Sequence, residues 1–140
     1  MTELLSLKSL RKRKVVDTAT AETIGRVRAF QIDLDTASVA AVVVKGRPGG
    51  IVARTDVISF GPDAVTLPDS SVVIEDPGAL PTDDDARGSR LLDETGRRLG
   101  KVEDMTMDAG GAVVSVTADG VSYEARLLGI GSYAVVISRV

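Results

Sequence analysis

A residue pattern that occurs twice constrains this sequence more than any other feature. In the first copy Asp17 is followed, after a polar turn, by residues 24–27, Ile-Gly-Arg-Val. In the second copy Asp93 is followed by residues 99–102, Leu-Gly-Lys-Val, and the alignment continues towards the end of each copy. The repeat unit is about 70 to 75 residues long, which exceeds a solenoid repeat and matches a small closed β unit that occurs twice.

The apolar residues recur mostly at every second position and in short runs between Gly, Asp and Pro, which is typical of short β-strands. Three hairpins are predicted, with turns at residues 36–38, at residues 61–63 and at Asp119-Gly120. Residues 48–50, Pro-Gly-Gly, lack the spacing of a phosphate-binding loop, and we interpret them as a further hairpin loop. Helical periodicity is weak throughout, so the sequence predicts an all-β fold class.

A polar segment separates the two copies. Residues 76–88, DPGALPTDDDARG, contain few side chains that a core would bury, and we interpret them as a solvated linker. A Ca²⁺ site at Asp83–Asp85 is disfavoured, because three adjacent carboxylates do not easily converge on one ion. The predicted organisation is a first unit at residues 1–76, an acidic linker with Pro and Gly at residues 77–88, and a second, shorter unit at residues 89–140.

Each unit is small for an independent hydrophobic core. A domain of about 60 residues buries only about 60% of the surface that its unfolded chain exposes. We therefore expect the two units to pack against each other or to share strands. Met105 and Met107 align with Phe30 and Ile32 of the first copy, so we expect both methionines in the core rather than on an adaptable binding surface.

The composition excludes several kinds of chemistry. The chain contains no Cys and no His, which rules out disulfides, thiolate nucleophiles, a His general base and metal sites built on sulfur or imidazole. No nucleophile and base are spaced as a catalytic pair. The sequence therefore predicts a protein that is not an enzyme, with no catalytic, cofactor-binding or metal-binding residues.

Two pairs of equivalent residues have structural interpretations. Gly25 and Gly100 lie inside predicted strands, where a glycine weakens the strand unless the backbone bends or packs closely there. Asp17 and Asp93 precede the polar turns, and we expect each carboxylate to accept hydrogen bonds from amides of its own turn. A catalytic carboxylate pair is disfavoured, because no other titratable residue is repeated beside them.

Charge is unevenly distributed along the chain. The formal net charge is −3, yet residues 1–14 carry five Lys or Arg residues against Glu3 alone. The run Arg11–Lys14 is the one patch suited to an anion, and we interpret it as a solvated or partner-facing edge. Nucleic acid is a disfavoured partner, because the chain has only four aromatic residues to stack on bases. No apolar stretch of about 18 residues is present, so we predict no membrane span and expect a cytoplasmic location.

Two further features are hypotheses for contacts with a partner. Arg28 aligns with Glu103, so equivalent outward positions carry opposite charges that favour pairing within the chain or between two chains. The apolar terminal strand at residues 133–140 is expected to be an open sheet edge that accepts a partner strand.

The repeated strand motif, the Asp-capped hairpin after it and the closing segment DVISFGPDAVTL at residues 56–67 together resemble the PRC-barrel family. This family is a small all-β barrel named for the photosynthetic reaction-centre H subunit, and it also occurs at the C-terminus of a ribosome maturation factor. The second copy departs in its closing segment, where residues 130–133, Ile-Gly-Ser-Tyr, replace the acidic turn. The other matching residues are Val15, Val16, Asp17, Ile24, Gly25, Arg26, Val27, Ile32 and Asp33 in the first copy, and Leu91, Leu92, Asp93, Leu99, Gly100, Lys101, Val102, Met107 and Asp108 in the second.

The resemblance covers nearly the whole chain outside the linker and implies two small PRC-barrel-like β-barrels in tandem. Such barrels are generally binding or assembly modules, and they bring no catalytic motif. The implied function is a non-enzymatic protein-interaction or assembly adaptor of prokaryotic type, whose partner is another protein or a second copy of the chain. The alternative is an RNA-processing or ribosome-assembly accessory protein, which the ribosomal member of the family suggests.

Overall fold

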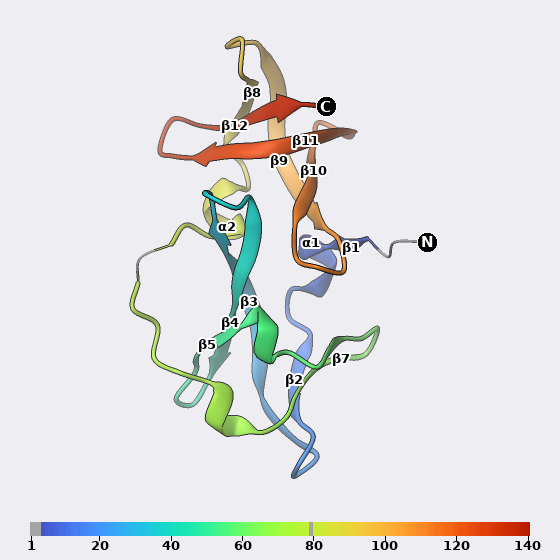
Figure 1. The fold of residues 1–140 in the computed structure, drawn as a ribbon, viewed down its shortest axis with the longest axis vertical. Coiled ribbons are helices and arrows are strands. Elements are labelled where there is room, and N and C mark those ends of the chain that lie inside the picture. The colour runs from blue at the N-terminus through green and yellow to red at the C-terminus, as the bar shows by residue number, and fades with distance from the viewer. Residues whose placement is uncertain (1–3, 79) are drawn as a thin grey trace.

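The computed structural model describes residues 4–78 and 80–140. Within this part of the chain, twelve strands form two six-stranded sheets, which lie one above the other along the long axis of the molecule (Figure 1). The predicted all-β fold class is confirmed. The helical elements are short: α1 (Leu7–Leu10), α2 (Asp83–Ala86) and the 3-10 turns η1 (Arg54–Asp56) and η2 (Ser70–Val72).

The first sheet is open, with the strand order β5-β4-β3-β2-β7-β6. The predicted turns at residues 36–38 and 61–63 join β3 to β4 and β6 to β7, and the loop at residues 48–50 joins β4 to β5. These hairpin predictions are therefore confirmed. The strands are β2 (Lys14–Asp17), β3 (Glu22–Asp33), β4 (Ser38–Gly46), β5 (Gly50–Ala53), β6 (Ser59–Phe60) and β7 (Ala64–Leu67).

The pairings of the second sheet form a ring. They run through β8, β9, β10, β11 and β12 and return to β8, and β1 adds a further strand beside β9. The predicted Asp119-Gly120 turn joins β10 to β11. The strands are β1 (Leu5–Ser6), β8 (Arg90–Asp93), β9 (Arg98–Met107), β10 (Val113–Ala118), β11 (Val121–Ile130) and β12 (Ala134–Arg139).

The prediction that residues 133–140 form an open edge is wrong. β12 pairs with β11 on one side and with the parallel strand β8 on the other. Because β8 comes from the start of the same half, its place beside β12 depends on tertiary pairing that the local pattern does not reveal. The backbone groups of β12 are therefore engaged within the molecule.

Equivalent residues of the two copies have equivalent places in the two sheets. β2 pairs in parallel with β7, where Asp17 lies opposite Leu67. β8 pairs in parallel with β12, where Asp93 lies opposite Ile137. The aligned motifs of the sequence thus mark the same strand pairing twice.

The structural repeat extends further towards the N-terminus than the sequence pattern indicates. α1 follows Ser6 and α2 follows Thr82, and each hydroxyl accepts a hydrogen bond from the first turn of its helix. Each helix leads to a residue with a positive φ, Lys12 at 67° and Gly88 at 85°. The second structural copy therefore begins near residue 81, inside the segment predicted as a linker.

The two copies exchange the segments that precede their helices. β1 pairs with β9 of the second sheet, and residues 81–83 lie beside β3 of the first sheet, where Ile32 N–H donates to the carbonyl oxygen of Pro81 at 2.8 Å. One hydrophobic core spans both sheets, and it includes Met105 and Met107 at 2% and 1% exposure, as predicted. The expectation that the two units pack together or share strands is confirmed in both respects.

The prediction of a solvated linker is wrong for its second part. Asp83 and Ala86 are buried, and Asp83 Oδ1 accepts a hydrogen bond from Phe30 N–H at 2.8 Å. The physical reason is the length of β3: β2 covers only its first residues, so its later N–H groups need other partners. Burial raises the pKa of the Asp83 carboxyl, while the Phe30 N–H and the Arg87 guanidinium oppose that shift.

Candidate functional site

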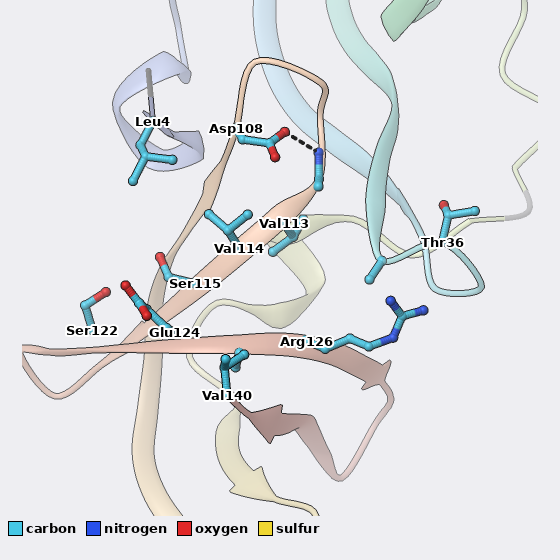
Figure 2. A pocket seen from close by; sticks show the side chains of 13 residues that line it. Leu4, Thr36, Asp108, Val113, Val114, Ser115, Ser122, Glu124, Arg126 and Val140 are labelled. Carbon is cyan, nitrogen blue, oxygen red and sulfur yellow. Dashed lines mark hydrogen bonds between the residues drawn. The ribbon is translucent and has the colours of Figure 1, made fainter. Parts of the chain in front are cut away.

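A cleft opens where the first sheet meets the second, and we call it the junction cleft (Figure 2). Its volume is about 580 Å³, which is in the usual range of ligand-binding cavities. The β3–β4 turn lies on one side, and β10 and β11 lie on the other. The lining residues are Leu4, Thr36, Ala37, Asp108, Ala112, Val113, Val114, Ser115, Ser122, Glu124, Ala125, Arg126 and Val140.

Hydrogen bonds hold the two sides of the junction cleft in place. The Arg126 guanidinium donates to the carbonyl oxygen of Asp35 at 3.2 Å and so ties β11 to the β3–β4 turn. Asp108 Oδ1 accepts a hydrogen bond from Gly110 N–H at 2.9 Å. It accepts a second one from Ala112 N–H at 3.0 Å, the dashed line in Figure 2. The Asp108 carboxylate is therefore engaged in the β9–β10 turn and serves to shape the cleft.

The junction cleft has an apolar floor and a polar rim. Val113 and Ala125 are buried and Val114 is half-buried, whereas Glu124 and Arg126 are exposed. An apolar centre surrounded by polar groups is the usual arrangement of a protein-protein contact. The geometry suits noncovalent binding of an apolar side chain whose neighbours are polar.

A second concave surface lies on the first sheet, and we call it the basic groove. Five of its six lining residues are Lys or Arg, and its volume is about 560 Å³. Arg26 on β3 lies directly opposite Lys45 on β4 and directly opposite Lys14 on β2. Like charges in opposed positions destabilise a sheet, so this arrangement calls for an explanation other than folding. The lining residues are Arg11, Lys12, Arg26, Val27, Arg28 and Lys45.

The structure divides the predicted basic run Arg11–Lys14. Arg11 and Lys12 line the basic groove, whereas Arg13 turns away and donates from Nη1 to the carbonyl oxygen of Gly61 at 2.6 Å. The remaining cations come from β3 and β4; sequence reasoning singled out Arg28 only as a partner for Glu103 and did not place any of them beside the basic run. The signal that would have found them is the register of the predicted β3–β4 hairpin, which brings distant basic residues beside the run.

Arg28 and Glu103 form no ion pair in residues 4–78 and 80–140. Glu103 Oε1 instead accepts a hydrogen bond from Gly120 N–H at 3.1 Å, while Arg28 lines the basic groove. The hypothesis of pairing within the chain is therefore not supported. Pairing between two chains stays a prediction.

The two repeated aspartates stabilise their own turns, as predicted. Asp17 Oδ1 accepts a hydrogen bond from Ala19 N–H at 2.7 Å, and Asp93 Oδ1 accepts one from Thr95 N–H at 3.0 Å. The hydrogen bond from the Thr95 hydroxyl holds the pKa of Asp93 below its usual value. Asp17 Oδ2 also accepts a hydrogen bond from Ser70 N–H at 3.1 Å, and Arg139 Nη2 lies 3.6 Å from Asp93 Oδ2, so both carboxylates are fully engaged within the molecule.

Both repeated glycines lie where a side chain would collide with a neighbour. A Cβ atom on Gly25 would lie 2.4 Å from the carbonyl oxygen of Lys45. A Cβ atom on Gly100 would lie 2.8 Å from Asp119 Oδ2, and the φ of Gly100 is 142°. The prediction of close packing at these two glycines is confirmed.

The class of protein follows from these observations: two curled sheets of short strands, each with an Asp-capped turn before its long hairpin, define a small all-β barrel module. Residues 3–80 match the family model of the PRC-barrel domain. This match covers more than half of the chain, and the protein belongs to the PRC-barrel family. A search of curated proteins gives no match.

No helix in residues 4–78 and 80–140 combines the length and the apolar character needed to cross a membrane. The same residues contain no group of three or more Asp or Glu side chains placed to hold a metal ion.

Proposed function

We propose that this protein is a non-enzymatic interaction or assembly adaptor that binds a partner protein at the junction cleft. PRC-barrel domains commonly act as protein-interaction modules, and residues 3–80 belong to that family. The observation that carries the proposal is the junction cleft, with its apolar floor and charged rim. The cytoplasmic location expected from the sequence belongs to the same proposal.

The proposal includes a tandem arrangement of two PRC-barrel-like units. We assign the units to residues 1–76 and 89–140, joined by residues 77–88, whose last part also forms the start of the second structural copy. Both units supply sides of the junction cleft, Thr36 from the first and Val114 from the second. A partner at the cleft would therefore contact both units at once, which favours their fusion in one chain.

The proposal is tested by affinity capture from an extract of the organism that encodes the protein, followed by mass spectrometry. Val114→Asp places a charge on the apolar floor of the junction cleft. Val114 is the extra residue at a β-bulge between Val113 and Ser115, so a change there leaves the strand pairing of β10 intact. We expect this variant to lose a partner that the wild type captures.

A matched control is Ile58→Asp, which adds the same charge at an apolar side chain that is 59% exposed and lies outside the junction cleft. This variant should capture the same partner as the wild type, and thermal unfolding should show that both variants are folded. Equal capture by the wild type and by Val114→Asp would contradict the proposed site.

A second candidate function, an RNA-processing or ribosome-assembly accessory protein, is favoured by the basic groove, because Lys and Arg side chains neutralise phosphates. Filter binding to structured RNA at low and at moderate salt tests this function. Binding that survives moderate salt and is lost in the double variant Arg26→Gln, Lys45→Gln would support it. Binding that disappears at moderate salt would reflect nonspecific attraction and count against it.

A further inference from the structure

We propose that the basic groove binds an acidic segment of a partner protein through its carboxylate side chains. The inference rests on the proposed adaptor function and adds a second contact surface to it. The junction cleft would recognise an apolar side chain, and the basic groove would recognise negative charge. Four observations carry the inference.

The first observation is that the scaffold does not require three of the five cations of the basic groove. The second structural copy has the same strand pairing, yet at three equivalent positions it has an uncharged or acidic residue, whereas Arg11 and Arg26 have the basic equivalents Arg87 and Lys101. The three differing pairs are Lys12 with Gly88, Arg28 with Glu103, and Lys45 with Asp119.

The second observation is a row of three like charges across neighbouring strands. Lys14, Arg26 and Lys45 lie opposite one another on β2, β3 and β4, about 4.8 Å apart from strand to strand. In the second copy the corresponding row is Arg90, Lys101 and Asp119, so an acidic residue stands where the first copy has Lys45. Asp119 Oδ1 accepts a hydrogen bond from Lys101 N–H at 3.2 Å. The row in the first copy opposes folding on its own and becomes favourable when an anion lies across it.

The third observation concerns the backbone of Lys12. Its φ of 67° lies in the left-handed region, which a glycine adopts without strain and which Gly88 adopts at the equivalent place. The Lys12 N–H donates to the carbonyl oxygen of Val27 at 2.8 Å, and the Lys12 carbonyl oxygen accepts from Arg26 Nη1 at 2.9 Å. These two hydrogen bonds hold the Lys12 backbone in a conformation that is strained for a lysine. In this position the Lys12 side chain adds a positive charge to the basic groove.

The fourth observation is that one end of the basic groove already binds a carboxylate. Asp84 on α2 lies 3.2 Å from Arg11 Nη2 and 2.7 Å from Arg87 Nη2. Its hydrogen bond with Arg87 holds the pKa of Asp84 below its usual value, and the charges of Arg11 and Arg28 act in the same direction. Among the described residues, Arg11 is the one lining cation in an ion pair, so the others remain for a ligand.

The composition of the groove favours an acidic peptide over nucleic acid or a lipid surface. Among the residues that the structure describes, no aromatic side chain lines it, so it offers no platform on which unpaired bases could stack. Asp84 lies at one end, beside Arg11, and the net charge of the chain is −3, so a long polyanion would meet repulsion beyond the groove. A short acidic segment satisfies the cations without extending over Asp84, and a concave site fits a peptide better than a flat membrane.

The experiment measures fluorescence anisotropy of a short fluorescein-labelled oligo-glutamate peptide titrated with the full chain. An oligo-glutamine peptide of the same length serves as the ligand control. The double variant Arg26→Gln, Lys45→Gln should bind the oligo-glutamate at least about tenfold more weakly, because two charged hydrogen-bond donors are removed. The matched control Lys101→Gln, at the position equivalent to Arg26, should bind it within about twofold of the wild type.

The single variant Lys45→Gln should also unfold at the same temperature as the wild type or at a higher one, because it removes one of two opposed like charges and leaves the hydrogen bond from Arg26 to the Lys12 carbonyl oxygen in place. A lower unfolding temperature would assign the cations to folding and overturn the inference. Equal loss of binding in the double variant and in Lys101→Gln would overturn it as well, as would tighter binding of structured RNA or of anionic vesicles than of oligo-glutamate.

Failure of this inference can be told apart from failure of the proposed function. Val114→Asp should lose the captured partner and keep oligo-glutamate binding. If oligo-glutamate does not bind while partner capture still depends on Val114, the inference fails and the adaptor function stands. If oligo-glutamate binds but Val114→Asp captures the same partners as the wild type, the junction cleft fails and the basic groove stands.

Discussion

The two halves of the molecule share one topology but differ in the continuity of a single strand. In the second half, β11 runs without interruption and pairs with both β10 and β12, which completes the ring. In the first half, the corresponding stretch is divided into β5 and β6 with the turn η1 between them, so β5 pairs with β4 and β6 with β7. One unbroken strand therefore decides whether this topology closes.

The interruption in the first half is used to attach the halves to each other. η1 carries Arg54 towards the β9–β10 turn, where a Cβ atom on Gly111 would lie 2.2 Å from the Arg54 side chain. The carbonyl oxygen of Gly111 accepts a hydrogen bond from Val39 N–H at 2.8 Å, and a bridge joins Ser38 to Ala112. The divided strand therefore leaves its own sheet open, and the η1 turn within it contacts the other sheet instead.

The open sheet completes its pairing with segments that lie outside its main strands. Residues 81–83 lie beside β3, and Ile74 pairs with Ile51 at the free edge of β5. In addition to its ring, the closed sheet pairs with β1 and, at its β9–β10 turn, with the start of β4 through the Ser38–Ala112 bridge. The comparison teaches that the closed half is nearly self-sufficient in backbone pairing, whereas the open half depends on the rest of the chain.

The largest expected effect comes from separating the halves. A fragment of residues 1–76 should show no cooperative thermal transition, because it lacks residues 81–83 and the shared core. A fragment of residues 81–140 should keep β structure and unfold cooperatively, though at a lower temperature than the intact chain, since fragments of about 60 residues bury a small share of their surface. Circular dichroism during heating measures both. Two stable, two-state fragments that together match the intact protein would refute the dependence of the open half.

The second prediction compares Gly50 in β5, part of the divided stretch of the first half, with Gly129 in the continuous strand β11 of the second half. A Cβ atom on Gly50 in β5 would lie 2.2 Å from the carbonyl oxygen of Ile74, and its φ is 148°. Gly50→Ala should therefore lower the free energy of unfolding by about 3 kcal/mol. Gly129 in β11 has no atom within 4 Å of a Cβ, so Gly129→Ala should change it by less than about 0.5 kcal/mol.

Urea unfolding of the two glycine variants measures the difference. A cost at Gly50 as small as that at Gly129 would show that the contact of β5 with Ile74 contributes little to the open half. The open half would then not depend on this edge contact for its stability, and the contrast with the closed half would not extend to the free energy of unfolding.

The third prediction concerns the acceptor that completes β3. Asp83→Ala leaves the Phe30 N–H without its partner in a buried place and should cost about 2 kcal/mol. Asp83→Asn keeps a side-chain oxygen that can accept this hydrogen bond and should cost less. Equal losses in the two variants would show that the buried charge of Asp83, rather than its acceptor, stabilises the open half.

The pH dependence of Asp83 has a defined sign. Burial raises its pKa in the folded state above the ordinary value of an aspartate, so folding favours the protonated carboxyl. Its contribution is fully present below that ordinary value and is lost as the pH rises through the raised pKa. The free energy of unfolding of the wild type, measured relative to Asp83→Asn, should therefore decrease from acid to neutral pH. An increase over this interval would contradict the raised pKa.

The parts of the fold that the sequence predicted depend on neighbouring residues. Asp17 stabilises a turn that begins beside it, and Asp119-Gly120 makes a hairpin whose strands are adjacent in the chain. The exchange of residues 81–83 was not predicted, because it depends on how far β3 extends beyond β2. A local signal for α2 did exist, since the Thr82 hydroxyl and the Asp85 carboxylate form a capping box, but that signal does not say where the helix packs.

The candidate sites show the same limit. The junction cleft joins Thr36 to Arg126, and no pattern in the sequence brings these residues together. The basic groove was half predicted, because Arg11 and Lys12 belong to a visible run, whereas Lys45 reaches it only through the pairing of β4 with β3. Charge in a contiguous run can be found from sequence, but charge collected across strands requires the register.

The smallest expected effect exchanges the two residues that follow the helices. Lys12→Gly should raise the free energy of unfolding by about 1 kcal/mol, because glycine adopts the left-handed backbone without strain. Gly88→Ala should lower it by about the same amount, since a Cβ atom there meets no neighbour and only the backbone strain remains. Urea unfolding measures both. Only Lys12→Gly should also weaken oligo-glutamate binding, and a variant that is more stable yet binds the peptide as the wild type does would show that this lysine is strained without serving the basic groove.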